Sequence, residues 1–196
     1  SALRSVFMRI TGGQARGIPI KAPSGDTTRP ATDRMREAIF SSLGSRVVGS
    51  RVADLFAGTG AYGLEALSRG ASQATFYEID RRALDCMRRN QQAVLKCCGL
   101  PPSAVQVVAR DLYTSPHSGE RANLIFIDPP YDAIEANLKR IFDKADTLAT
   151  EDARIILELP GDLSPTIDGW QMLRRFGKPK RDTPNAAIFA RTERAT

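Results

Sequence analysis

The chain contains 196 residues, 42% of them hydrophobic and 26% charged, which is the composition of a soluble globular protein and excludes a disordered or fibrous chain. No apolar run approaches the roughly 18 residues of a membrane-spanning helix, and residues 1–7 are too short and broken for a secretory signal. Three cysteines, two of them adjacent, do not make a disulfide framework, so we expect a reducing cytoplasm. Because His117 is the single histidine, His-rich zinc sites are excluded and no metal is expected.

The positive charge is concentrated in the first quarter of the chain. The net charge is +6, and residues 1–50 carry eight cations against three anions, whereas the other 146 residues carry twenty against nineteen. Twenty-two of the cations are arginines, whose planar guanidinium groups suit phosphate oxygens. The imbalance favours a nucleic-acid partner; the alternative is a solvated surface with a tag remnant before Met8.

The predicted elements begin with a small N-terminal unit. Residues 8–22 mix isoleucines with glycines, which predicts short strands around glycine turns, and residues 23–30 form a polar linker. A helix is predicted from Asp33 to Leu43, where apolar residues recur at helical spacing, and Gly44 ends it. We assign residues 1–30 to a basic extension with a β-hairpin and linker, and residues 31–196 to the main domain.

From residue 51 onward, short apolar runs alternate with helical patterns. Strands are predicted at 51–56, 74–79, 105–109, 124–127 and 154–159, and helices at 61–69, 82–97 and 134–148. Residues 170–176 and 186–190 are predicted to form a closing pair of strands. Alternating elements, with strands apolar on both faces, predict an α/β fold whose parallel sheet is covered on both sides.

A glycine-rich loop follows the first of these strands. Gly58, Gly60 and Gly63 satisfy the G-x-G-x-x-G pattern between a strand and a helix, where glycines allow a tight turn and close contact with a ligand. The second strand ends at Glu78, 20 residues after Gly58, and a carboxylate there can accept both hydrogen bonds of a ribose diol. This loop, including Phe56, therefore predicts an adenosine-containing ligand at the carboxyl ends of the strands.

The acidic residues near the loop bear on which ligand binds. NAD needs a clear helix N-terminus for its pyrophosphate, whereas S-adenosylmethionine has no phosphate and carries an ammonium group that Asp54 could bind directly or through water. Alternatively, Asp54 caps the amides of its own loop. After the third strand, Asp111 could accept from an adenine amino group while Ile79 and Leu112 cover the ring faces; the alternative is an exposed loop acid.

The most specific motif is Asp128-Pro129-Pro130-Tyr131, which follows the fourth strand. Two prolines fix the backbone and remove two amide donors, which leaves carbonyl oxygens and the Asp128 carboxylate as a row of acceptors. Such a row can hold both N–H groups of an exocyclic amine and aim its nitrogen at a sulfonium methyl, while Tyr131 offers a ring for base stacking. No histidine base is needed, because the methylated nitrogen becomes acidic and can lose its proton to a carboxylate, a carbonyl or water.

Together these motifs resemble the class I S-adenosylmethionine-dependent methyltransferases that act on amino groups, and more narrowly the bacterial 16S rRNA (guanine-N2)-methyltransferases. The segments that carry the resemblance are Met8–Gly13, Arg16–Gly17, Arg29–Phe40, Asp54–Gly70 and Asp128–Tyr131. The resemblance implies a Rossmann-like seven-stranded sheet with helices on both faces and a small N-terminal hairpin. It also implies S-adenosylmethionine as cofactor and methyl transfer to N2 of a guanine in small-subunit ribosomal RNA.

The same resemblance implies roles for individual residues. Glu78 would bind the cofactor ribose, Asp111 the adenine, and Asp128–Tyr131 the target guanine. Ala31 and Tyr62 depart from the family pattern, which has a threonine and a commoner aliphatic residue at these positions, but neither departure alters the carboxylates or the prolines. The expected partner is ribosomal RNA or the small ribosomal subunit, and the expected enzyme is a monomer.

The N-terminal arginines are predicted to grip the RNA backbone, while the α/β domain supplies the cofactor site and the chemistry. A guanine whose N2 edge reaches the active site must be unpaired or extruded first. The predicted RNA contacts are Arg9, Arg16, Arg29, Arg34 and Arg36. For Arg34 and Arg36 the alternative is a salt-bridged helix that uses Asp33 and Glu37.

Three rival functions remain open on sequence alone. A nicotinamide-dependent dehydrogenase also uses G-x-G-x-x-G. A methyltransferase with the same acceptor row could act on DNA adenine or a protein glutamine, although the chain has no large target-recognition domain. An RNA-binding module with a vestigial fold is disfavoured, because the carboxylates and the Asp128–Tyr131 segment are intact.

Overall fold

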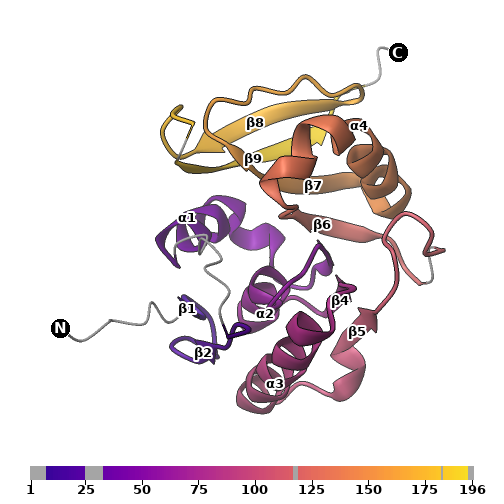
Figure 1. Cartoon of the computed structure of the whole chain (residues 1–196). Coiled ribbons are helices and arrows are strands. Elements are labelled where there is room, and N and C mark those ends of the chain that lie inside the picture. Colours follow the sequence, from indigo (N-terminus) through magenta and orange to yellow (C-terminus); the bar gives the residue numbers. More distant parts are fainter. Residues whose placement is uncertain (1–7, 25–32, 117–118, 182, 194–196) are drawn as a thin grey trace.

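The computed structural model describes residues 8–24, 33–116, 119–181 and 183–193. Its main sheet has seven strands in the order β5-β4-β3-β6-β7-β9-β8 (Figure 1). The strands are β3 (Arg51–Leu55), β4 (Gln73–Tyr77), β5 (Val105–Val108), β6 (Ala122–Ile127), β7 (Ala149–Pro160), β8 (Trp170–Phe176) and β9 (Pro184–Arg191). The first five are parallel, whereas β9 is antiparallel to both β7 and β8. The predicted α/β fold is confirmed, and the closing strand pair makes the sheet mixed instead of wholly parallel.

Helices cover both faces of the sheet, as predicted. The helices α1 (Asp33–Leu43), α2 (Ala61–Ser68) and α3 (Arg81–Cys98) pack on one face, and α4 (Tyr131–Leu148) packs on the other (Figure 1). Because both faces are covered, alternate residues of β6 enter different cores: Leu124 and Phe126 pack with the first group of helices, and Ile125 and Ile127 pack with α4. Within the described residues, no helix is both long enough and apolar enough to cross a membrane.

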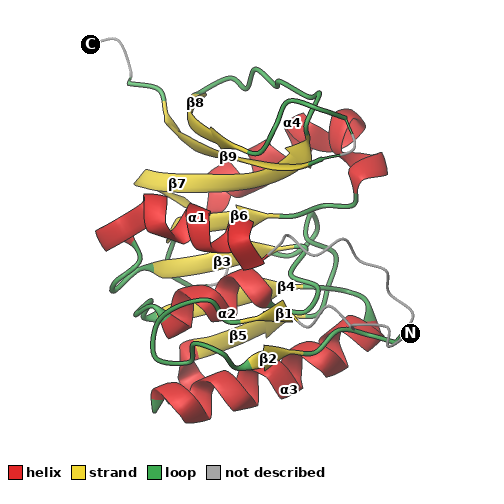
Figure 2. Ribbon diagram, turned by 90° about the vertical axis from the view of Figure 1, so that its left-hand side faces the viewer, coloured by secondary structure: helices red, strands yellow, loops and turns green. Residues whose placement is uncertain are grey.

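The N-terminal hairpin docks onto the main domain as a separate two-stranded sheet. β1 (Met8–Arg9) pairs antiparallel with β2 (Pro19–Ile20), and the hairpin lies over α2 and α3 (Figure 2). Gln14 donates its backbone N–H to the Ser68 carbonyl at 2.8 Å, and Ala15 donates to the Ser68 hydroxyl at 2.9 Å. Gly13 has a φ of +78°, and a Cβ there would lie 1.9 Å from the Ser68 carbonyl oxygen. Only glycine therefore allows the hairpin to approach the end of α2 this closely.

A buried carboxylate fastens the hairpin to the helices. Glu65 of α2 accepts hydrogen bonds from the backbone N–H groups of Thr11 and Gly12, each at 2.9 Å, and from the Thr11 hydroxyl. It also pairs with Nε of Arg69 at 3.0 Å. A buried charge is costly unless it is paired and hydrogen-bonded, and these contacts meet that requirement. The Thr-Gly-Gly opening therefore serves to dock the hairpin.

Arg36 completes this ion network, and the prediction that it contacts RNA is wrong. Its side chain is 0% exposed, with Nε 3.1 Å from Glu65 and Nη2 3.0 Å from Asp33. Nη2 also donates to the Arg9 carbonyl. A side chain with no exposed surface cannot reach the phosphate of a partner, so the salt-bridged alternative holds for Arg36, with Glu65 as its buried partner instead of Glu37. Arg29, from the same prediction, lies outside the described residues.

Candidate active site

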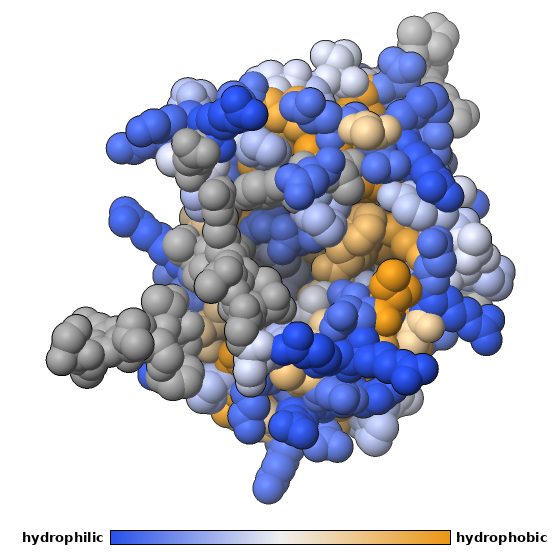
Figure 3. All heavy atoms as spheres, in the orientation of Figure 1, coloured by the Kyte–Doolittle hydropathy of each residue, from blue (hydrophilic) through white to orange (hydrophobic). Residues whose placement is uncertain are grey.

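The predicted site residues meet at the carboxyl edge of the sheet. From β3 the chain first builds outward through β4 and β5, and then crosses to β6 on the other side of β3. In open α/β sheets, ligands bind outside the carboxyl ends of the strands at such a switch point. Figure 3 shows this edge hollowed between α4 and the start of α3.

The three loop glycines are required for different reasons. Gly58 and Gly60 have φ values of +55° and +81°, so both lie in the left-handed region that favours glycine. Gly63 lies inside α2, where a Cβ would meet the Phe76 ring at 2.4 Å. Phe56 has a φ of +60° and is the only non-glycine residue with a positive φ among those described. The tight turn and the close packing that the motif predicts are both present, and Phe56 marks a strained backbone at the strand end.

Glu78 directly follows β4 and its carboxylate is fixed by backbone donors. Oε2 accepts from the Gly58 N–H at 2.8 Å, and Oε1 accepts from the N–H groups of Ile79 and Asp80 at 2.8 Å each. The carboxylate thus lies against the glycine loop, and its predicted contact with a ribose stays a prediction. Ile79 beside it is 65% exposed, so an apolar side chain is open to a ligand ring.

Asp54 is buried at the end of β3, and its observed contact is with its own loop. Oδ2 accepts from the Gly63 N–H at 3.0 Å, as the alternative interpretation expected. Burial raises the pKa of the Asp54 carboxyl well above its usual range; the Gly63 N–H opposes this, and the charges of Asp128 and Glu78 add to it. Three carboxyl groups from β3, β4 and β6 therefore act on one another in one small volume, a favourable place for a cationic ligand.

The residues predicted to contact adenine have separate environments. Asp111 is exposed after β5, and Oδ1 accepts from the backbone N–H groups of Tyr113 and Thr114 at 2.7 and 3.3 Å. Leu112 is buried in the core on the α4 side of the sheet. Of the two side chains expected to cover the ring faces, Ile79 offers the open surface. The adenine contacts stay predictions.

The Asp128–Tyr131 segment leads from β6 straight into α4. Asp128 is half-buried and its N–H points to the Leu55 carbonyl at 3.5 Å, which joins the segment to the end of β3. Pro129 is buried, and Pro130 is the N-cap of α4. The side chain of Tyr131 lies outside the described part of the structure. Burial raises the pKa of the Asp128 carboxyl well above its usual range, and the charge and hydrogen bond of Glu158 raise it further.

Glu158 and Tyr62 belong to this site and were not predicted from sequence. Glu158 of β7 is 6% exposed, and the pairing of Ile127 with Leu157 places it opposite Asp128. The Tyr62 hydroxyl of α2, whose side chain is 5% exposed, donates to Oε1 of Glu158 at 2.6 Å. A charged residue within the apolar run at 155–159 was the available signal for Glu158, because such a residue is seldom buried without a partner.

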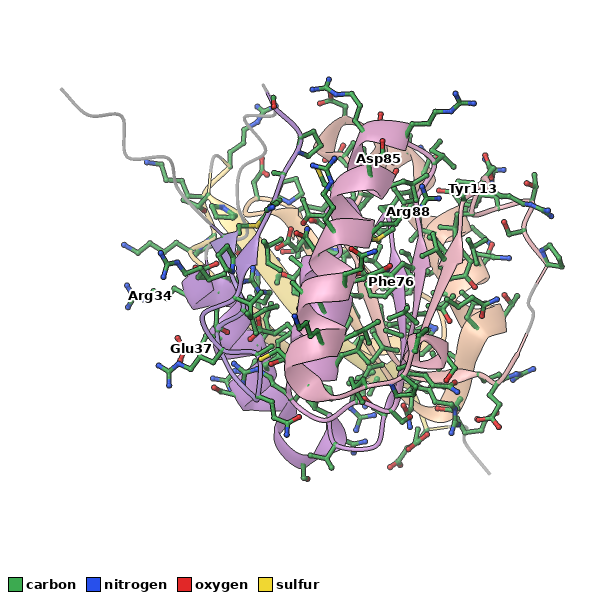
Figure 4. All side chains as sticks on the ribbon, turned by 90° about the horizontal axis from the view of Figure 1, so that it is seen from below. Arg34, Glu37, Phe76, Asp85, Arg88 and Tyr113 are labelled. Atoms are coloured by element: carbon green, nitrogen blue, oxygen red, sulfur yellow. The ribbon has the colours of Figure 1, made fainter. Side chains whose placement is uncertain are left out.

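Exposed cations flank the same edge. Because β8 runs parallel to β7, the β8–β9 loop lies at the carboxyl edge, and hydrophilic side chains gather over it above the hollow in Figure 3. Its exposed cations are Lys178, Lys180 and Arg181. Near the start of α1, Arg9 and Arg34 are exposed, and Arg34 points into solvent in Figure 4. Arg16 is exposed too, but its loop packs on Ser68 and Cys97 at the C-terminal ends of α2 and α3, at the opposite edge of the sheet. The C-terminal loop was not predicted as a contact, because the sequence did not show that it returns to this edge.

The β8–β9 loop and the neighbouring 160–163 segment are held by partly buried polar contacts. Arg175 donates to the carbonyls of Pro160, Gly161 and Leu163 at 2.7 to 3.1 Å. The Asn185 amide donates to the Lys178 carbonyl at 2.8 Å. The backbone that carries Lys178 is therefore hydrogen-bonded to β9.

Comparison with known proteins places these features in a family context. Residues 8–181 match the family described as Conserved hypothetical protein 95. The chain is 36% identical over 157 residues to Bacillus subtilis YlbH, covering 77% of this chain and 82% of that protein. It is 38% identical over 125 residues to the Ribosomal RNA small subunit methyltransferase D of Escherichia coli, covering 63% of this chain and 60% of that enzyme. The solved structure of Escherichia coli YhhF matches with a TM-score of 0.78 at 31% identity, covering 94% of this chain and 98% of that chain.

Proposed function

Since the chain belongs to the Conserved hypothetical protein 95 family, we propose that it transfers a methyl group from S-adenosylmethionine to the N2 amine of a guanine in small-subunit ribosomal RNA. One observation carries the proposal. Glu78, the glycine loop and the acceptor row at Asp128 follow three neighbouring strands, β4, β3 and β6, so a sulfonium methyl and an amine can meet at this edge of the sheet.

S-adenosylmethionine is the cofactor, and the residues at the carboxyl edge fit it. Glu78 is fixed against the glycine loop as an acceptor for ribose hydroxyls, and the exposed Ile79 side chain lies next to it for the adenine. The buried carboxyl group of Asp54 favours a ligand that carries positive charge. When bound, the cofactor supplies an electrophilic methyl group on a sulfonium.

The Asp128 segment has the chemistry to hold the guanine amine. Its carboxylate and the proline carbonyls accept the two N–H groups, which orients the nitrogen lone pair toward the methyl group. As the N–C bond forms, the nitrogen becomes acidic, and Asp128 can take one of its protons. This assignment explains why the segment is acidic and rigid and why no histidine is needed.

The exposed cations give the RNA a path across the carboxyl edge. Arg9 and Arg34 are proposed to bind phosphates on the α1 side, and Lys178 and Lys180 on the β8–β9 side. Ionic contacts to phosphate release counterions, so they weaken binding as salt rises. The hollow between the two groups of cations would receive the extruded guanine.

The decisive experiment is methylation with radiolabelled S-adenosylmethionine. Small subunits and ribosomal RNA would come from a strain that lacks the corresponding enzyme, and the modified nucleoside would be identified by mass spectrometry. We expect N2-methylguanosine with the parent protein and none with Asp128→Asn. A methylated adenosine, methylation of a protein, or no transfer to small-subunit RNA would each refute the proposal.

The RNA path has its own test. Lys178→Glu with Lys180→Glu should weaken RNA binding and lower the slope of log Kd against log salt by about one for each lost phosphate contact. The matched control is Lys139→Glu, an exposed lysine of α4 whose neighbours include Asp143 and Trp170 at the start of β8. If the control lowers the salt slope as much as the double variant, the proposed path is wrong.

A further inference from the structure

Asp128 and Glu158 form a pair of neighbouring carboxyl groups from adjacent strands. The register of β6 and β7 pairs Ile127 with Leu157, so the next residues of the two parallel strands face one another. Glu158 is 6% exposed, and Asp128 is half-buried at the mouth of the site. Two carboxyl groups so placed repel each other when both are ionised, so each makes loss of the last proton harder for the other.

Tyr62 is a hydrogen-bond donor to the Glu158 member of this pair. Its hydroxyl donates to Oε1 of Glu158 at 2.6 Å, and its ring stacks on Phe126 at a centroid distance of 4.9 Å. A hydroxyl that donates to a carboxylate stabilises the ionised form. Burial raises the pKa of the Asp128 carboxyl well above its usual range, and the charge and hydrogen bond of Glu158 raise it further.

We propose that Glu158 and Tyr62 are positioning residues that hold a negative charge behind Asp128 and so make the Asp128 carboxylate a stronger acceptor for the proton that leaves the guanine amine. This inference rests on the proposed function. In the step, the N–CH₃ bond forms as the S–CH₃ bond breaks, and the electron pair of that bond stays on a neutral sulfur. The amine loses one N–H proton to Asp128, which later releases it to water.

Other charged groups face the pair and are common to all variants in the test. Asp54 at the end of β3 interacts with the charge of Asp128, and the charge of Arg36 of α1 acts on the Tyr62 hydroxyl. Asp54 raises the cost of ionising Asp128, and Arg36 lowers the cost of negative charge near Tyr62. Neither group moves when Glu158 or Tyr62 is replaced by an uncharged side chain of similar shape.

The test is the pH dependence of a single methylation turnover in two variants, both of which should move that dependence to lower pH. Methylation should need ionised Asp128, so the parent rate should rise with pH. In Glu158→Gln the neighbouring charge is gone, and the rise should move to lower pH by about 1 to 3 units. In Tyr62→Phe the Glu158 carboxylate loses its donor and competes better for the proton of the pair, so Asp128 ionises at lower pH and the rise should move in the same direction by a smaller amount.

A merely structural role would give a different pattern. Both variants would then lose rate by a constant factor at every pH, with the rise unmoved, and the inference would be overturned. If Glu158→Gln fails to fold, Tyr62→Phe still decides, because it keeps the ring and its stacking on Phe126. Titration of the Asp128 carboxyl by ¹³C NMR in the free protein needs no substrate, so it tests the pair even if guanine is not the target. Unchanged titration in both variants would refute the inference independently of the proposed function.

Discussion

Replacement of Arg36 by methionine tests whether this arginine belongs to the protein interior. The change removes the charge and keeps a long, flexible side chain. Arg36 makes three polar contacts, to Glu65, Asp33 and the Arg9 carbonyl, from a position with no exposed side-chain surface. The substitution therefore leaves the Glu65 carboxylate without its fully buried partner.

The magnitude follows from the burial and the remaining contacts. Removing one partner of a buried ion pair costs about 3 to 5 kcal/mol. Glu65 keeps Arg69 and two backbone donors, so the lower end of that range applies. For a protein of this size, a loss of about 3 kcal/mol lowers the Tm by about 6 to 12 °C.

The Tm of Arg36→Met is compared with that of Arg34→Met in thermal denaturation. Arg34→Met is the matched control, because the two arginines lie on the same helix and, of the two, Arg34 is the exposed one. Arg34→Met should change stability by no more than about 0.5 kcal/mol and should weaken RNA binding. A cycle with Glu65→Gln should show coupling of about 1 to 3 kcal/mol between Arg36 and Glu65. An unchanged Tm in Arg36→Met, together with a loss of RNA affinity at a temperature where the protein is folded, would refute the reasoning.

Three further predictions concern the carboxyl edge. Glu78→Ala should weaken S-adenosylmethionine binding by about 1 to 3 kcal/mol in calorimetry, because the ribose hydroxyls lose an acceptor. Asp128→Asn should leave that binding near the value of the parent protein. Equal losses of cofactor affinity in the two variants would contradict this division of roles. Burial raises the pKa of the Asp54 carboxyl in the folded protein, so Asp54 ionises at lower pH in the unfolded chain than in the folded one. The free energy of unfolding of the parent protein should therefore fall as the pH rises above about 4. Denaturant titrations of Asp54→Asn should show a smaller fall over the same pH range. Gly63→Ala should cost about 1 to 3 kcal/mol of stability in the same assay, since its Cβ would lie 2.4 Å from the Phe76 ring, and an unchanged midpoint would contradict that packing.

Local patterns predicted most of the fold, because each is tied to a periodicity or a terminator. The helix predicted from Asp33 to Leu43 has those bounds in the structure, and the stripe on α4 is buried from Ile134 to Leu148. The antiparallel placement of β9 was missed, since strand direction depends on which edge of the sheet is free. Helix and strand periods carry no information about that choice.

The site was predictable where the chemistry lies within one short segment. The glycine loop, Glu78 and the Asp128–Tyr131 segment could be located from spacing alone, whereas Glu158 depends on the register between β6 and β7. The prediction that Arg36 contacts RNA was wrong for a related reason. Its charge suggested a surface contact, and only the position of Glu65 on a helix that packs against α1 shows that the charge is neutralised inside the protein.

A crystal structure with S-adenosylhomocysteine and a guanine nucleoside tests the central claim most directly. The account predicts the ribose hydroxyls on the Glu78 carboxylate and the guanine amine on the oxygens of the Asp128 segment, with the sulfur facing that amine. Binding of either ligand at the opposite edge of the sheet, or of the two in separate cavities with no common opening, would contradict it.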